Sequence, residues 1–260
     1  MYSKNSSSAI INVMKRAILK AGKITIRDFG ELEHLQISGK SPLSFAEVTK
    51  SKIAKILYEE LLTARPNFRI IIDGKLVHDT ESELLFDLEI LDGIDNFIHS
   101  LTFFTINLSL QRTEQNKTET ISSLIYAPIL DELYIAEKNS GARVDKASDS
   151  LSKNSRLRVS SRKKLDEALI ILGLSKEQKF FKPIVEILNK NNLNYRLINC
   201  NALSFCYFVS GRADLIIAEN KPYNLFAKES GGFIYDLKSQ NLNLTVASNE
   251  YLAKEFLSLM

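Results

Sequence analysis

A chain of 260 residues with 45% hydrophobic residues is long enough to bury a substantial core, which predicts a globular protein. Its 34 basic and 31 acidic residues nearly balance, so the formal charge of +3 does not by itself indicate nucleic-acid binding. No apolar run approaches the roughly 18 residues of a membrane span, and neither Cys200 nor Cys206 lies near a cluster of Cys or His that would indicate zinc. We therefore expect a soluble, cytoplasmic protein with two buried thiols.

Two helices are expected first along the chain. Residues 8–29 carry apolar residues at helical spacing, and basic residues interrupt them, which favours an amphipathic helix over the core of a signal peptide. Residues 45–63 repeat the helical spacing, and Pro66 is expected to end this second helix.

Strands are expected to follow the two helices. FRIIIDG, residues 68–74, predicts a short strand that ends at Asp73, and a polar connection then leads to a second strand around residues 84–91. Residues 103–112 alternate as a strand, and residues 116–144 add two or three more. Successive strands of this kind imply an antiparallel or mixed sheet.

Helices and strands also alternate in the second half. We expect a short strand in LRVS, an apolar segment ALIILGLS, helices near residues 180–192 and 201–214, and strands in LIIAEN, GGFIYDL and LTVAS. A polar loop, residues 148–155, separates the halves. The sequence therefore predicts an α+β protein, a layered α/β sandwich of alternating helices and mostly antiparallel sheets, whose two α/β halves meet near residues 145–155.

Acidic residues interrupt the otherwise apolar stretch LEILDGIDNFIHSLTFF, residues 88–104. One interpretation is structural: Glu89 and Asp92 flank a turn, and Asp95 is the N-cap of the helix that follows. The other is chemical: these acids and Asp73 lie at the ends of neighbouring strands and converge on one sheet edge. Clustered carboxylates repel one another unless a cation joins them, and their oxygens suit Mg²⁺.

The turn after Asp92 adds a second chemical feature. The backbone N–H groups of Gly93 and Ile94 precede a helix and could face an anion. Metal-binding acids next to an anion-binding turn indicate phosphate chemistry, in which the ions neutralise phosphate charge and activate a water.

The segment EILDGIDNF, residues 89–97, resembles the signature D-P-[IL]-D-G-T-x-N-F of the inositol monophosphatase family, and most closely its bacterial extragenic-suppressor branch. The resemblance runs almost end to end and includes AGKITIRDFGELEHLQIS, ARPN, LIYAPILDELYIAEK, RLRVS, SGRAD and KESGGFIYDL. It implies a single domain over residues 1–260 with the layered fold shared by inositol monophosphatases and fructose bisphosphatases.

The resemblance also implies Mg²⁺ and a set of ligands for it. The family's metal-binding groups fall on the side chains of Asp73, Glu89 and Asp92, the carbonyl of Leu91 and, with a gap, Asn224. Asp73 stands where the family has Glu, and Glu89 stands where it has Asp. Asn224 offers a neutral oxygen where the family has an anion, which implies weaker ion binding.

Further positions depart from the family pattern. The V-T-x-A-D pattern has no clean counterpart in SPLSFAEVTKSK, where Lys50 stands at its aspartate. Ile94 stands at the threonine that, with the first acid (Asp73 here), is thought to position the attacking water; losing one such polar group costs roughly a hundredfold in rate. Asp95 adds negative charge that opposes a dianionic substrate. Gly93 and Ile94 are the implied phosphate-binding amides, and Glu219 is the nearest candidate for accepting a substrate hydroxyl.

Two hypotheses about function stay open. The first is a Mg²⁺-dependent phosphomonoesterase that acts on an inositol or sugar phosphate with impaired or altered activity, whether its site is decayed or rebuilt with other ligands. The second is a non-catalytic member that binds a protein or RNA partner, because relatives in the bacterial branch are associated with RNA polymerase and antitermination. The resemblance also implies a homodimer.

Two polar features allow a structural as well as a functional interpretation. His99 could act as a general acid, although a surface or structural role is favoured. The basic run RLRVSSRKKL, residues 156–165, could contact RNA or an acidic partner, although a solvated loop is the default interpretation.

Overall fold

The computed structural model describes residues 4–38, 41–115, 117–148, 155–174, 179–219, 223–239 and 242–260; within them, the side chains of residues 4–8, 33–38, 219, 236–239 and 242–245 lie outside the description. The chain divides into two compact units. The first comprises Met1–Ile135 and Asp145–Lys153, and the second comprises Ala136–Val144 and Asn154–Met260. The single domain that the resemblance implies stays a prediction, and most of the polar loop at residues 148–155 falls outside the described residues.

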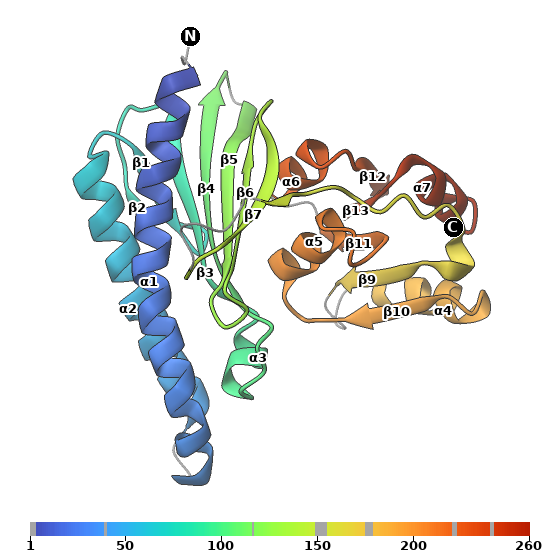
Figure 1. Ribbon diagram of the computed structural model, residues 1–260, viewed down its shortest axis with the longest axis horizontal. Coiled ribbons are helices and arrows are strands. Elements are labelled where there is room, and N and C mark those ends of the chain that lie inside the picture. The colour runs from blue at the N-terminus through green and yellow to red at the C-terminus, as the bar shows by residue number, and fades with distance from the viewer. Residues whose placement is uncertain are drawn as a thin grey trace. The chain divides into compact units, whose positions relative to one another are not determined.

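The first unit packs two long helices against one face of a sheet (Figure 1). Its elements are α1 (Lys4–Ser38), α2 (Pro42–Ala64), β1 (Arg69–Ile72), β2 (Lys75–His78), β3 (Leu84–Asp92), α3 (Ile94–Ile98), β4 (Thr105–Glu114) and β5 (Lys117–Ala127), and the unit includes parts of β6 (Glu132–Glu137) and β7 (Gly141–Lys146). With β8 (Ser155–Arg156), the described strands form an eight-stranded sheet in the order β2-β1-β3-β4-β5-β6-β7-β8.

Helix α2 begins three residues before the predicted residues 45–63 and ends one residue after them. Ser41 is the N-cap, its hydroxyl accepts a hydrogen bond from the Ser44 N–H at 3.4 Å, and Pro42 occupies the first turn, where its missing N–H costs nothing. The helix stops at Ala64, just before Pro66, as expected. Its buried residues recur at helical spacing and form the face that packs on α1 and the sheet: Ala46, Thr49, Ile53, Leu57 and Leu61.

A hairpin replaces part of the polar connection predicted after Asp73. Ile72 pairs with Lys75 across antiparallel strands β1 and β2, so Asp73 and Gly74 form a two-residue turn. Both residues have positive φ, 46° and 78°, which is the geometry that an Asp-Gly pair favours in a tight hairpin. The prediction of a connection without a strand was wrong here because the exposed residues of β2 lack an apolar face.

The second unit contains a five-stranded mixed sheet among its described residues, in the order β10-β9-β11-β13-β12. Its elements are η1 (Leu165–Glu167), β9 (Leu169–Gly173), α4 (Phe181–Lys190), β10 (Asn194–Leu197), α5 (Asn201–Val209), β11 (Leu215–Glu219), α6 (Asn224–Glu229), β12 (Phe233–Ser239), β13 (Leu242–Ser248) and α7 (Glu250–Leu257). Strand β9 runs parallel to β10 and β11, whereas β13 is antiparallel to β11 and β12. Strand β10 and helix α7 were not predicted, and LRVS contains no strand because β8 ends at Arg156.

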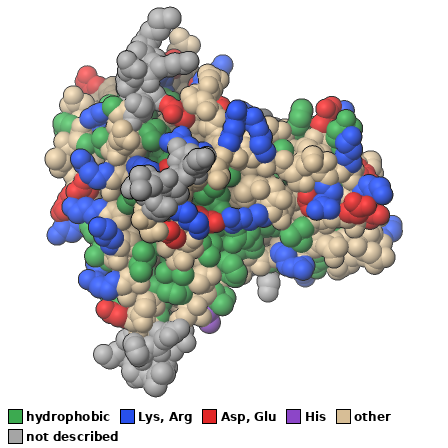
Figure 2. All heavy atoms as spheres, viewed as in Figure 1, with side chains coloured by type: hydrophobic (Ala, Val, Ile, Leu, Met, Phe, Trp, Pro, Cys, Tyr) green, Lys and Arg blue, Asp and Glu red, His purple; other side chains and the backbone are tan. Residues whose placement is uncertain are grey.

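The layered α/β fold class is confirmed, with both sheets mixed. The parallel pair β1 and β3 lies in the first sheet, and its neighbours β2 and β4 are antiparallel to it. Within the part of the chain that the structure describes, no helix is long and apolar enough to cross a membrane. On the helical face of the first unit, Lys and Arg side chains alternate with Asp and Glu (Figure 2).

Candidate metal and phosphate site

A β-bulge interrupts strand β3 within the family-like segment. Glu89 pairs with Asn107 and Asp92 pairs with Thr105 on β4, so two residues of β3 lie opposite one residue of β4. Leu91, inside this bulge, has a φ of 58°, which is unusual for a residue with a branched side chain. Bulges and strained residues of this kind are over-represented next to active sites because they redirect backbone groups and side chains.

Asp73 lies beside this bulge. Strand β1 runs parallel to β3 with Ile72 opposite Leu88, and the Asp73 N–H continues the ladder by donating to the Leu88 carbonyl at 2.9 Å. The Ile90 N–H in turn donates to Asp73 Oδ1 at 2.8 Å. The register thus brings Asp73 next to the Glu89–Asp92 segment, through local backbone hydrogen bonds.

Other side chains already contact these acids. Lys50 Nζ on α2 lies 3.3 Å from Asp73 Oδ2, so both oxygens of the Asp73 carboxylate have a partner. Asn107 Nδ2 donates to Glu89 Oε2 at 3.2 Å. Among the described residues, no group of three or more His, Cys, Asp or Glu side chains could hold a metal ion. As they lie here, the acids do not form a complete set of ligands for Mg²⁺.

The turn after the bulge begins helix α3 differently from the structural interpretation. Gly93, with a φ of 86°, is the N-cap, and no side chain caps the helix. Asp95 is the second helical residue and is exposed, so the prediction that it is the N-cap was wrong; glycine takes that position because it tolerates positive φ. Ile94 is the first helical residue and packs against the core. His99 Nδ1 lies 2.7 Å from the Asp95 carbonyl, which gives His99 a structural contact.

Two implied site residues belong to the second unit. Asn224 is the first residue of α6, after the buried N-cap residue Tyr223. Glu219 is the last residue of β11, and its side chain lies outside the described part of the structure. The roles of Asn224 and Glu219 stay predictions.

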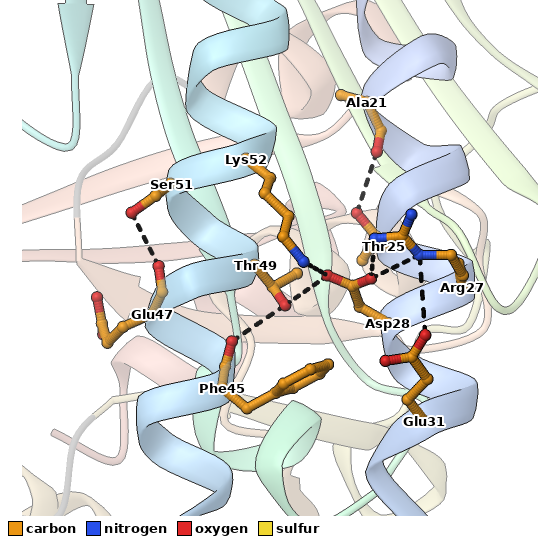
Figure 3. Close-up of polar contacts among 10 residues, drawn as sticks. All are labelled: Ala21, Thr25, Arg27, Asp28, Glu31, Phe45, Glu47, Thr49, Ser51 and Lys52. Carbon is orange, nitrogen blue, oxygen red and sulfur yellow. Dashed lines mark hydrogen bonds and ion pairs between the residues drawn. The ribbon is translucent and has the colours of Figure 1, made fainter.

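A buried acid lies between the first two helices and has no local signal in the sequence. The Asp28 side chain is 0% exposed and accepts hydrogen bonds from Thr49 at 2.8 Å, Lys52 at 3.0 Å and Arg27 at 2.6 Å (Figure 3). Burial raises the pKa of this carboxyl, but the hydrogen bonds and nearby charges outweigh burial, so the pKa lies below its ordinary value. An acid in an amphipathic helix is normally expected on the solvated face. Asp28 is buried because α1 pairs with α2.

The basic run at residues 156–165 has internal partners. Arg162 Nε lies 3.2 Å from Oδ1 of the buried Asp214, and Lys164 pairs with Glu167. Lys163 Nζ lies 4.8 Å from the centre of the Tyr251 ring. Several of its charges therefore have partners within the second unit, while Arg162, Lys163 and Lys164 stay exposed, as the solvated-loop interpretation expects.

The comparisons with known proteins agree with this fold. The sequence model described as "Inositol monophosphatase family" matches residues 6–257. An inositol-1-monophosphatase of Rhizobium meliloti is 30% identical over 95% of this chain and 94% of its own length. A Nus factor SuhB of Pasteurella multocida is 24% identical over 96% of this chain and 94% of its own length. The solved extragenic suppressor protein suhB of Bartonella henselae is 28% identical, with a TM-score of 0.78 over 96% of this chain and 98% of that one. The chain belongs to the inositol monophosphatase family, which is generally metal-dependent.

Proposed function

We propose that this protein is a phosphomonoesterase that acts on an inositol or sugar phosphate with impaired or altered activity. The observation that carries the proposal is the contact between Asp73 and the β3 bulge, in which the Ile90 N–H donates to the Asp73 carboxylate at 2.8 Å. This contact keeps an acid beside the segment that bears Glu89 and Asp92. The relatives named inositol-1-monophosphatase, which match nearly the whole chain, support the same activity.

The proposed ligands of a weakly bound Mg²⁺ are the Asp73, Glu89 and Asp92 side chains and the Leu91 carbonyl, with Asn224 as a further ligand. Weak binding is supported by the partners that Asp73 already has and by the incomplete cluster of acids among the described residues.

The turn after the bulge and the end of β11 supply the remaining proposed groups. The amides of Gly93 and Ile94 hold the phosphate, and Glu219 accepts a substrate hydroxyl. An impaired rate is supported by Ile94, which has no hydroxyl to position a water with Asp73. Asp95, exposed in the first turn of α3, adds negative charge near a dianionic substrate.

The test is release of phosphate from inositol 1-phosphate and from a panel of sugar phosphates, with and without Mg²⁺. We expect slow release that Mg²⁺ stimulates and that Asp92→Ala abolishes. Release no faster than that of the Asp92→Ala variant under every condition would rule out the phosphatase proposal.

A second candidate is a non-catalytic role with a transcription partner. It is favoured by the relatives named Nus factor SuhB, which match this chain at about the same length, and by the departures from the family pattern at Ile94 and Lys50. The proposed partner is RNA polymerase or RNA. Affinity capture from lysate with and without nuclease distinguishes direct binding of RNA polymerase from binding through RNA, because an RNA-bridged partner is lost after nuclease treatment. Recovery of the chain without either partner argues against this role.

We also propose a homodimer. Light scattering coupled to size-exclusion chromatography measures the mass directly, and a mass equal to that of one 29.4 kDa chain would contradict the proposal.

A further inference from the structure

We propose that the Lys50 ammonium is a built-in cation of the candidate site, which neutralises Asp73 and weakens the binding of a divalent ion to this carboxylate. Lys50 Nζ lies 3.3 Å from Asp73 Oδ2, and the two side chains are 26% and 36% exposed. The inference rests on the proposed role of Asp73 as a cation ligand and does not require turnover.

Asp73 is held in position to receive this charge. Its backbone lies in the tight turn between β1 and β2, and its N–H donates to the Leu88 carbonyl at 2.9 Å. Its Oδ1 accepts from the Ile90 N–H at 2.8 Å, which leaves Oδ2 for Lys50. A metal ion at this carboxylate would have to share its oxygens with these two donors, one of which carries a positive charge.

The position of Lys50 is fixed by contacts that neighbouring residues of α2 make with α1. Its neighbour Thr49 is buried and donates to Asp28 at 2.8 Å, and Lys52 donates to the same carboxylate oxygen at 3.0 Å. These contacts fix this turn of α2 against α1 (Figure 3). Lys52 and Arg27 contact Asp28, whereas Lys50, two residues before Lys52 on the helix, contacts a different acid, Asp73.

Electrostatics favours the tethered charge over an ion from solution. A divalent cation at Asp73 would lie close to the Lys50 ammonium, and like charges at such separations repel strongly in a partly buried site. The ammonium is already attached to the chain, whereas Mg²⁺ must lose part of a tightly held hydration shell before it binds. Removing the positive charge from residue 50 should therefore release Asp73 for a metal ion.

The experiment uses Mn²⁺ as the probe, because electron paramagnetic resonance counts the free ion directly. We compare the full-length wild-type protein with Lys50→Met, which keeps the length without the charge, and Lys50→Arg, which keeps the charge. Lys50→Met should bind Mn²⁺ about tenfold more tightly or better, whereas Lys50→Arg should bind as weakly as the wild type. Lys50→Gln provides a second neutral side chain and must behave like Lys50→Met.

A double variant assigns the gain to the correct acid. Combining Lys50→Met with Asp73→Asn should return Mn²⁺ affinity to the wild-type level, and circular dichroism of each metal-free variant checks its folding. The proposal is overturned if neither neutral variant binds Mn²⁺ more tightly, or if the gain survives Asp73→Asn. Ion binding is measured separately from phosphate release. Tighter Mn²⁺ binding by the neutral variants, together with no phosphate release above the level of Asp92→Ala, would reject the phosphatase proposal and leave the role of Lys50 standing.

Discussion

Thr49 on α2 donates a 2.8 Å hydrogen bond to the carboxylate of Asp28 on α1, and both side chains are fully buried. Lys52 contacts the same carboxylate oxygen, and Arg27 contacts the other. The acid is tolerated inside the helix pair because each of its oxygens has a charged or hydroxyl donor. It joins the helix that carries Lys50 to the first helix of the chain.

Replacing this buried acid should destabilise the first unit. Asp28→Asn removes the charge that Lys52 and Arg27 face and turns an amide NH₂ toward donors. We expect the free energy of unfolding to fall by about 2–3 kcal/mol, the range for hydrogen bonds to charged groups. Urea unfolding followed by circular dichroism measures the change. Glu31→Gln is the control, because Glu31 is 56% exposed and 4.0 Å from Arg27, and it should change stability by no more than about 0.5 kcal/mol.

The same carboxylate predicts a dependence of stability on pH. Burial raises the Asp28 pKa, but its hydrogen bonds and nearby charges leave it below the ordinary value. Its contribution is therefore fully present above the unfolded pKa of about 3.9 and is lost as the pH falls through the lower pKa of the folded state. Below about pH 4, the unfolding free energy of the wild type should fall more steeply than that of Asp28→Asn. Parallel curves for the two proteins would show that Asp28 makes no such contribution.

Gly22 in α1 is required by a close contact with the Tyr126 ring on β5. A Cβ at residue 22 would overlap the edge of this buried ring, which cannot move freely within the core. Gly22→Ala should therefore lower the free energy of unfolding by about 1–3 kcal/mol, the usual cost of overpacking, despite the better helix propensity of alanine.

Gly30 in the same helix is the matched control. Nothing lies within 4 Å of a Cβ built at this position, and the residue is exposed. Gly30→Ala should stabilise the protein by about 0.5–1 kcal/mol through helix propensity alone. Thermal unfolding of the two variants should shift in opposite directions, and a common direction would contradict the assigned contact.

Restoring a hydroxyl after the bulge should raise phosphatase activity. Ile94→Thr supplies a polar group of the kind that typically contributes roughly a hundredfold in rate, so we expect phosphate release to increase at least about tenfold. The variant should lose about 1–2 kcal/mol of stability because Ile94 packs partly buried against the core. Ile94→Val, which also lacks a hydroxyl, is the control. Equal rates for the two variants would mean that another position limits the reaction.

Local sequence predicted much of the fold. Helical spacing and Pro66 identified α2, although its Ser41-Pro42 start lies before the predicted residues 45–63, and β3 and β4 were predicted within a few residues. The hairpin after Asp73 also has a local signal, the Asp-Gly pair, although the exposed β2 lacks the apolar pattern of a strand. By contrast, the sequence contains no feature that distinguishes Asp28 from a solvated acid, because its burial depends on the pairing of two helices.

Residue type and spacing were enough to identify the family, most of the helices and strands around the acidic segment, and the absence of a hydroxyl at Ile94. Which charged side chains contact one another depends on the folded chain. The register of β1 on β3 brings Asp73 to Ile90, and the packing of α2 brings Lys50 to Asp73. Contacts between residues far apart in the chain depend on strand register and helix packing, which no local pattern encodes.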